Sequence, residues 1–182
     1  VSPQSVANAA AGLTQLATRI GPSGLASKAV DGYLKGATVF ADTNGNHKLD
    51  AGELSITTDA SGGFTIPGGV TGNLVVVGGS DLLTNKAFKG MLGALPGSIV
   101  VNPVTTMLES LVSRGNAATV EQAMGKLVAA LKLPANIDPL TYDPLAVLAN
   151  GKASAADKQV ALAYEKVNAK LANIVSVAAA AV

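Results

Sequence analysis

The stretch that decides the fold is A-T-V-F-A-D-T-N-G-N-H-K-L-D-A-G-E-L-S-I-T-T, residues 37–58. Its two ends, residues 37–40 and 54–58, have the β-branched composition and the period-two alternation of strands. Between them, from Asp42 to Glu53, side chains that carry oxygen fall at loop positions 1, 3, 5, 9 and 12. The sequence therefore predicts two strands joined by a polar loop with regularly spaced oxygen atoms.

This spacing is the one that a calcium-binding loop uses. Calcium is a hard cation that takes roughly 6–8 oxygen ligands, whereas magnesium prefers a small octahedral site that keeps several waters. The alternative is an Asn-Gly hairpin turn with acidic residues present by chance, and six matched positions in register argue against it. The predicted Ca²⁺ ligands are five side chains, the fourth binding directly or through a water, and one backbone carbonyl: Asp42, Asn44, Asn46, Asp50, Glu53 and the carbonyl of Lys48.

Three further positions of the loop have structural roles. The sixth residue is usually glycine, because the backbone turns sharply there with positive φ, and here it is His47. Histidine enters the left-handed region more often than most residues do, at some cost, and Gly45 can absorb part of the turn. Leu49 occupies the hydrophobic position of the loop, so we expect it to anchor the loop on a core.

The composition excludes several classes of function. The 182 residues carry 13 Lys and Arg, 12 Asp and Glu and 3% aromatic side chains, so nucleic-acid binding is not expected. Cysteine is absent, which excludes disulfides and thiolate metal sites. The longest apolar run, residues 174–182, is shorter than the ~20 residues that span a bilayer. Charged residues make up only 14%, so we expect a surface rich in alanine or apolar surface covered by another copy or a partner.

The chain divides into three zones, which together predict an α+β fold. Residues 1–31 hold a helix that starts after Ser2 and stops at Gly21-Pro22, followed by a linker. Residues 32–101 hold short strands separated by glycine-rich turns, as in a small antiparallel β-sandwich. Residues 102–182 form a helical subdomain. Beyond the two strands that flank the loop, strands are expected at residues 64–66, 74–77, 86–92 and 98–101.

The last zone carries four helix starts, each marked by a capping side chain. The expected caps are Asn102, Thr119, Asp143 and Ser154. Because strands and not helices flank the predicted metal loop, the opening switch of a helix-loop-helix calcium sensor is not expected.

A resemblance to a known family rests on G-Y-L-K-G-A-T-V-F-A-D-T-N-G-N-H-K-L-D-A-G-E followed by T-T-D-A-S-G-G-F-T-I-P. These strings, within residues 32–78, resemble the B-type repeats of bacterial surface proteins, the prealbumin-like sandwich modules of serine-aspartate-repeat and collagen adhesins. The later strings V-V-G-G-S-D-L-L-T-N-K-A-F-K-G-M-L, V-N-P-V-T-T-M-L-E-S-L-V and D-P-L-A-V-L-A-N-G are similar to modules of very large secreted bacterial adhesins. The resemblance supports the same six ligands and adds Asp59 as a further candidate, for which a plain Asx-turn role is the alternative.

The resemblance implies a calcium-dependent structural or adhesive module, exported to the surface of a bacterium or to its surroundings. We expect it to associate with copies of itself or with other surface-protein modules. The alternative is a module that binds a glycan or a peptide, although a chain without tryptophan offers little for stacking sugars. An enzyme is not expected, because the single histidine lies inside the metal loop and no nucleophile elbow or phosphate-binding loop occurs.

Overall fold

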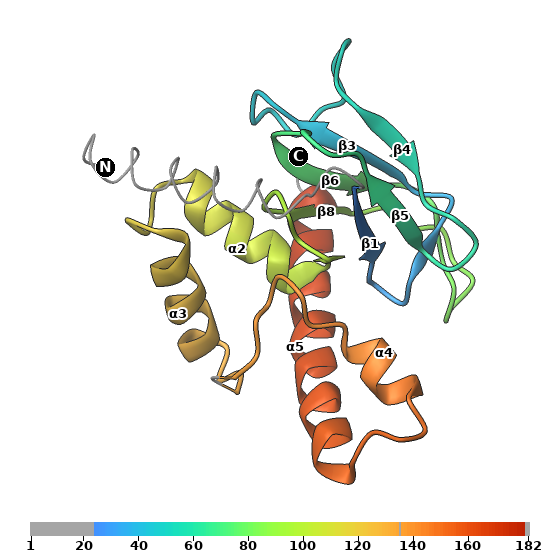
Figure 1. The fold of residues 1–182 in the computed structure, drawn as a ribbon, viewed down its shortest axis with the longest axis vertical. Helices are drawn as coiled ribbons and strands as arrows, with labels where there is room; N and C mark the ends of the chain where they lie inside the picture. The colour runs from blue at the N-terminus through green and yellow to red at the C-terminus, as the bar shows by residue number, and fades with distance from the viewer. Residues whose placement is uncertain (1–23, 135, 181–182) are drawn as a thin grey trace.

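The computed structural model describes residues 24–134 and 136–180, with side chains as far as Asn173. It is a mixed α+β structure with several antiparallel strand pairs and, in the described residues, four helices (Figure 1). The helix predicted after Ser2 lies outside the described residues. Within them, no helix combines the length and the apolar character that crossing a membrane requires.

The largest sheet has four strands in the order β4-β3-β6-β8, and every neighbouring pair in it is antiparallel. The central pair, β3 and β6, is rich in valine, a β-branched residue that favours strands, and most of its residues are buried. The strands are β3 (Thr38–Asp42), β4 (Ser55–Thr57), β6 (Asn73–Val77) and β8 (Met91–Ala94). The strands predicted on both sides of the polar loop are therefore confirmed as β3 and β4.

A second sheet has three strands in the order β5-β1-β9. Strand β1 (Leu25–Ala29) pairs antiparallel with β5 (Gly63–Ile66) and parallel with β9 (Val100–Val101). The sequence places residues 25–29 in the linker, and this prediction is wrong. The stretch is short and mixes Ser and Lys with Leu and Ala, so only partners far along the chain make it a strand.

Two smaller details also differ from the sequence predictions. A strand is expected over residues 86–92, but β8 begins at Met91, and only Ala87 of the earlier part forms a bridge, with Ser80. A short third sheet joins β2 (Leu34–Lys35) to β7 (Ser80–Asp81).

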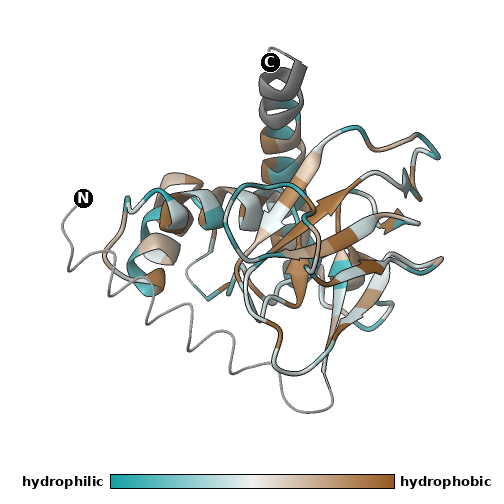
Figure 2. Cartoon of the chain, turned by 90° about the horizontal axis from the view of Figure 1, so that it is seen from above, coloured by the Kyte–Doolittle hydropathy of each residue, from teal (hydrophilic) through white to brown (hydrophobic). Residues whose placement is uncertain are grey.

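The two larger sheets share one hydrophobic core. Side chains from strands of both sheets meet there, and Figure 2 shows the apolar residues gathered along these strands. Its buried members are Ala29, Leu34, Ala37, Val39, Phe64, Ile66, Leu74, Val76, Leu92, Ala94 and Val101.

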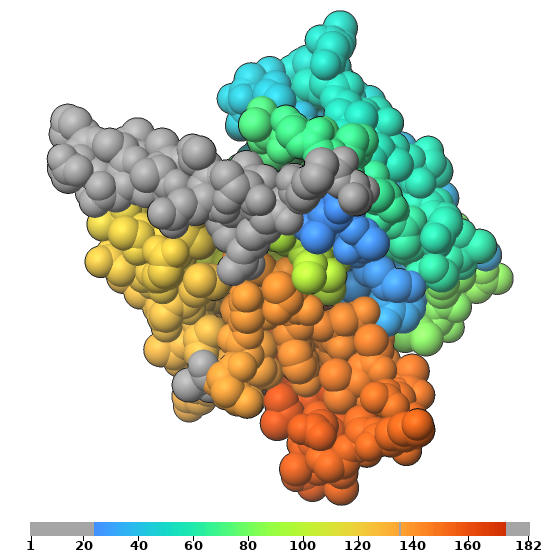
Figure 3. Space-filling view, viewed as in Figure 1, coloured from blue at the N-terminus to red at the C-terminus, as the bar shows by residue number. Residues whose placement is uncertain are grey.

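The helical part has a second core, which begins where β8 ends. Figure 3 shows the later residues, in orange and red, packed directly beside the earlier residues of the strand region, in blue and green. The helices are α2 (Pro103–Ser113), α3 (Val120–Ala130), α4 (Pro144–Ala149) and α5 (Ala155–Ala180). Their shared core is built around Leu95, Val104, Leu108, Val112, Val120, Leu127, Leu140, Tyr164 and Leu171.

The four predicted helix caps are confirmed. Asn102 accepts a hydrogen bond from the amide of Thr105 and forms a capping box with it, while Thr119 accepts from the amide of Gln122. Asp143 accepts from the amide of Ala146, and the hydroxyl of Ser154 accepts from the amide of Asp157. Because α2 starts two residues after β9 and also packs on β8, it is the helix that joins the two cores.

Candidate metal centre

The predicted metal loop begins at the end of a central strand. Asp42 is the last residue of β3 and is only 2% exposed, and it pairs in register with Asn73 of β6. Gly72, with φ +104, lies so close that a Cβ there would come within 2.6 Å of the Asp42 carbonyl oxygen. The first predicted ligand is therefore held by the end of a central strand and not at the tip of the loop.

The carboxylate of Asp42 organises the first half of the loop. Its Oδ1 accepts hydrogen bonds from the backbone amides of Gly45 (2.7 Å) and Asn46 (3.2 Å). Its Oδ2 accepts from the amide of His47 at 2.8 Å. These three hydrogen bonds hold the backbone of residues 45–47 around the carboxylate.

The sharp turn expected at the sixth loop position is present. His47 has φ +58, and Gly45 and Gly52 have φ +76 and +93. A non-glycine residue in this region costs free energy and persists only where its surroundings hold it. Two sets of contacts hold His47: its amide binds Asp42, and its ring approaches a buried glutamate described below.

Three predicted ligands meet in the middle of the loop. The side-chain amides of Asn44 and Asn46 both donate to Oδ2 of Asp50, at 2.7 and 2.6 Å. These two bonds, that from Asn44 first, lower the pKa of the exposed Asp50 carboxyl below its usual range. Oδ1 of each asparagine accepts a backbone amide, from Asn46 at 3.0 Å and from Lys48 at 2.7 Å. Each amide oxygen has two lone pairs, so one remains for a cation.

Glu53 closes the loop onto its starting point. Its Oε1 accepts from the amide and the hydroxyl of Thr43, at 2.8 and 3.0 Å, and its Oε2 accepts from the amide of Asp50 at 3.1 Å. The twelfth loop position thus lies beside the second. Hydrogen bonds of side chains and backbone amides thus link all six predicted ligand residues, Lys48 through its backbone amide alone.

One prediction about the loop is wrong. Leu49 is 47% exposed and does not anchor the loop on a core. The anchoring comes instead from the two ends, because Asp42 belongs to β3 and the amide of Ala41 donates to the carbonyl of Leu54. A loop fixed at both strand ends does not need a buried leucine at its tip.

The donor set fits a hard cation. Three carboxylates and two amide oxygens provide oxygen only, and the imidazole of His47 points out of the loop. Among the described residues, no three His, Cys, Asp or Glu side chains are arranged as a metal-binding group. The three carboxylates of the loop, Asp42, Asp50 and Glu53, therefore do not converge on one point in this structure.

Sequence reasoning missed two residues next to the loop, Glu109 of α2 and Asn73 of β6. Glu109 is 3% exposed, and its Oε2 lies 3.5 Å from Nε2 of His47. Its Oε1 accepts from Nδ2 of Asn73 at 2.8 Å and from the hydroxyl of Ser113 at 2.7 Å. A signal existed, because Glu109 shares the helical spacing of the buried Thr105 and Val112.

Asp59, the further candidate, belongs to a different place. It comes two residues after β4, near the open end of the β3–β4 hairpin, where Thr58 pairs with Ala37. The metal loop is the connection at the opposite end of the same hairpin. Its Oδ1 accepts from the amide and hydroxyl of Ser61 and from the amide of Gly63. These bonds lower the pKa of the Asp59 carboxyl, that from the Ser61 hydroxyl first. Asp59 therefore stabilises an Asx turn.

A second group of acidic side chains surrounds Tyr33. Its hydroxyl donates to Oδ2 of Asp143 at 2.9 Å. Burial, followed by the nearby charges of Asp143 and Asp31, raises the pKa of Glu165, while a hydrogen bond from Asn168 opposes the rise. The hydrogen bond from Tyr33 to Asp143, the N-cap of α4, joins the strand region to the helical part, so we interpret the group as structural.

This group makes a pH-dependent prediction. The folded state raises the pKa of Glu165, so folding disfavours its ionised form, and stability falls as pH rises through that pKa. We expect Glu165→Gln to have a higher melting temperature than the wild type at about pH 7 and no advantage at about pH 4. Thermal denaturation at both pH values tests this. The exposed Glu121→Gln is the control, and an equal gain at both pH values would contradict the expectation.

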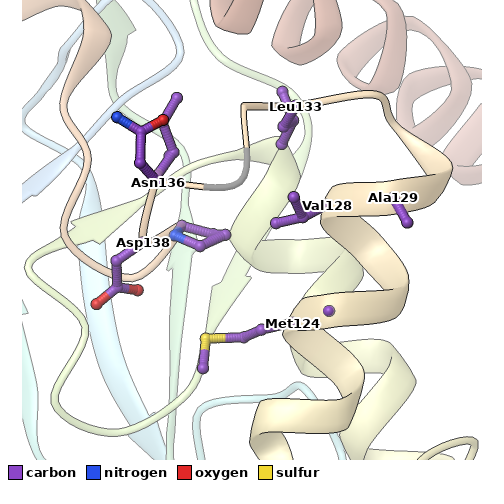
Figure 4. Close-up of a pocket in the computed structure, with 9 residues that line it drawn as sticks. Met124, Val128, Ala129, Leu133, Asn136 and Asp138 are labelled. Carbon is purple, nitrogen blue, oxygen red and sulfur yellow. The ribbon is translucent and has the colours of Figure 1, made fainter.

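The structure also contains an apolar pocket of about 590 Å³ between α3 and the segment that follows it (Figure 4). Met124, Val128 and Leu133 line it, together with Asn136 and Asp138. Oδ1 of Asp138 accepts from the amide of Leu140, so this carboxylate serves the local turn. The pocket lacks the convergent polar groups that the loop has, and the loop is the stronger candidate site.

Comparisons of the chain with protein-family models, with curated proteins and with solved structures find no match.

Proposed function

We propose that the chain is a calcium-binding structural or adhesive module of an exported bacterial surface protein. The observation that carries the proposal is the loop Asp42–Glu53, whose oxygen-bearing side chains form one group between two paired strands. Ca²⁺ would neutralise much of the charge of Asp42, Asp50 and Glu53 and so hold the two strand ends together. In this proposal the two larger sheets form a prealbumin-like sandwich.

With asparagine at two ligand positions, the loop carries fewer charges than many calcium sites, and a modest affinity follows. A dissociation constant of about 10⁻⁵ to 10⁻³ M suits extracellular calcium. If calcium binds only the folded state, a concentration 100 times the dissociation constant adds about 2.7 kcal/mol to the free energy of unfolding. The cation would act as a reversible clamp on the two strand ends.

Self-association is the second part of the proposal. The surface has little charge, and large apolar side chains are exposed at Leu49, Leu83, Ile99 and Leu162. A surface or matrix assembly of many copies would cover such side chains.

A calcium-dependent peptide-binding adhesin module is the second candidate, and the apolar pocket beside α3 favours it over sugar binding. Sugar sites use exposed aromatic faces, but here Phe40, Phe64 and Tyr164 are buried. The half-buried rings of Phe88 and Tyr142 pack against the two cores, and the ammonium of Lys28 covers the ring of Tyr33. The pocket could hold an apolar side chain of a peptide without any of them.

The proposal predicts the effect of Glu53→Gln on calcium binding. Glutamine can still accept the hydrogen bonds from Thr43, but it loses the charge and the bidentate grip on a cation. We expect at least a roughly tenfold weaker calcium affinity by calorimetric titration with little change in metal-free stability. Glu121→Gln, on the first turn of α3, is the matched control and should bind as the wild type does.

The result that would overturn the proposal is a wild-type chain that takes up no calcium at millimolar concentration. Light scattering and negative-stain microscopy, with calcium and then a chelator, separate the two candidates. Reversible filaments or sheets support assembly, whereas a monodisperse monomer in both states favours the peptide-binding module.

A further inference from the structure

Two side chains of the strand region converge on one buried carboxylate of the helical part. His47 leaves the metal loop and brings Nε2 to 3.5 Å from Oε2 of Glu109. Asn73, the register partner of Asp42, donates to Oε1 of the same side chain at 2.8 Å. The residue at the sixth loop position therefore contacts Glu109 directly. The first predicted ligand is linked to Glu109 through its register partner, Asn73.

The carboxylate of Glu109 is buried, so it depends on protein groups and not on water for its hydrogen bonds. It is 3% exposed on α2, and a Cβ on Gly93 of β8 would lie 3.3 Å from its Oε2. Its hydrogen bonds come from Asn73 and Ser113, and His47 adds a contact of 3.5 Å between Nε2 and Oε2. Contacts to a buried carboxylate are worth more than those of a surface ion pair, because the buried charge has no water to replace a lost partner. The position of His47 thus matters to α2 as well as to the loop.

His47 also gains something that glycine could not supply. Glycine would adopt φ +58 without strain, but it has no side chain to reach Glu109. We propose that His47 is a positioning residue that joins the loop to α2 through Glu109, so that a cation bound in the loop also stabilises this helix. This inference rests on the proposed calcium binding and assigns it a second effect, on the junction between the two cores.

The physical basis is reciprocal coupling. A ligand stabilises the conformation that binds it, together with every contact that only this conformation makes. Where such a contact joins the site to a second element, ligand binding also stabilises that element. Calcium would fix the loop backbone at His47, whose amide already binds Asp42 at 2.8 Å. With the backbone fixed, the imidazole stays beside Glu109, and local opening of α2 becomes rarer.

Hydrogen exchange of the whole chain with and without calcium tests the proposal. In the wild type, calcium should slow exchange in the loop and also slow exchange of the α2 amides, by about tenfold. In His47→Gly the loop should still respond to calcium, because the ligands remain, but the slowing in α2 should fall to less than about threefold. Glu109→Gln provides the same test from the helix side, and Leu49→Ala, an exposed loop residue, should respond as the wild type does.

Each outcome decides the matter. Loss of the α2 response in His47→Gly with the loop response intact supports the proposal. An α2 response that is equal in the wild type and in His47→Gly, or absent from both while the loop responds, overturns it and leaves calcium binding standing. A wild-type loop that does not respond to calcium overturns this inference and the proposed function together.

Discussion

Asp42→Ala is expected to lower the free energy of unfolding of the metal-free protein by about 2–3 kcal/mol and to remove most of the stabilisation by calcium. The first effect arises because three backbone amides, those of Gly45, Asn46 and His47, lose their common acceptor. The second arises because Asp42 is the only predicted ligand that lies within a strand. Adding Glu53→Gln should abolish the rise in melting temperature that calcium causes.

The matched control is Asp59→Ala, at the other end of the same hairpin. Asp59 also accepts hydrogen bonds from nearby residues, Ser61 and Gly63, but it is exposed and outside the loop. This variant should lose some stability and keep the full response to calcium. Thermal denaturation with calcium and with a chelator distinguishes the two variants, and an undiminished calcium response in the double variant at Asp42 and Glu53 would refute the ligand assignment.

Leu108→Ala has the largest effect that we expect on the fold itself, about 3–5 kcal/mol. Leu108 is fully buried on α2 and belongs to the core of the helical part. Truncation removes the transfer free energy of its side chain and leaves a cavity that its neighbours fill only in part.

Leu162→Ala is the control for this variant, because Leu162 lies on α5 and is 49% exposed. Its free energy of unfolding by chemical denaturation should change by no more than about 0.5 kcal/mol. A similar loss in both variants would mean that the helical core is not built around Leu108.

The parts of the fold that could be predicted are those set by neighbouring residues. The four caps, Asn102, Thr119, Asp143 and Ser154, were visible because each bonds within one turn of its own helix. The strands on either side of the loop were visible for the same reason, since they pair through a hairpin.

The parts that could not be predicted depend on residues far apart in the chain. Strand β1 forms because it pairs with β5 and β9, and the composition of residues 25–29 does not indicate that either strand will lie beside it. The burial of Leu49 was predicted wrongly because the spacing of the loop residues does not show whether apolar side chains lie next to the loop. The contact between His47 and Glu109 joins a loop to a distant helix, so no spacing rule could indicate it.

The loop shows the same division. Its oxygen spacing follows from the sequence, and so does the positive φ of His47. The burial of Asp42 and the closure of Glu53 onto Thr43 depend on where the strands end. Whether calcium occupies the loop is the prediction that the variants above test.

The pairing of β1 with β9 has a consequence for the order in which the chain can fold. The hydroxyl of Ser27 donates to the carbonyl of Ser98 across 71 positions, next to the two parallel residue pairs. A contact of this separation forms late, because bringing its two ends together costs the conformational entropy of the long segment between them. A chain delivered from its amino-terminal end would therefore hold β1 against β5 with its other edge open until β9 arrives. During that interval the open edge could pair with a strand of another molecule.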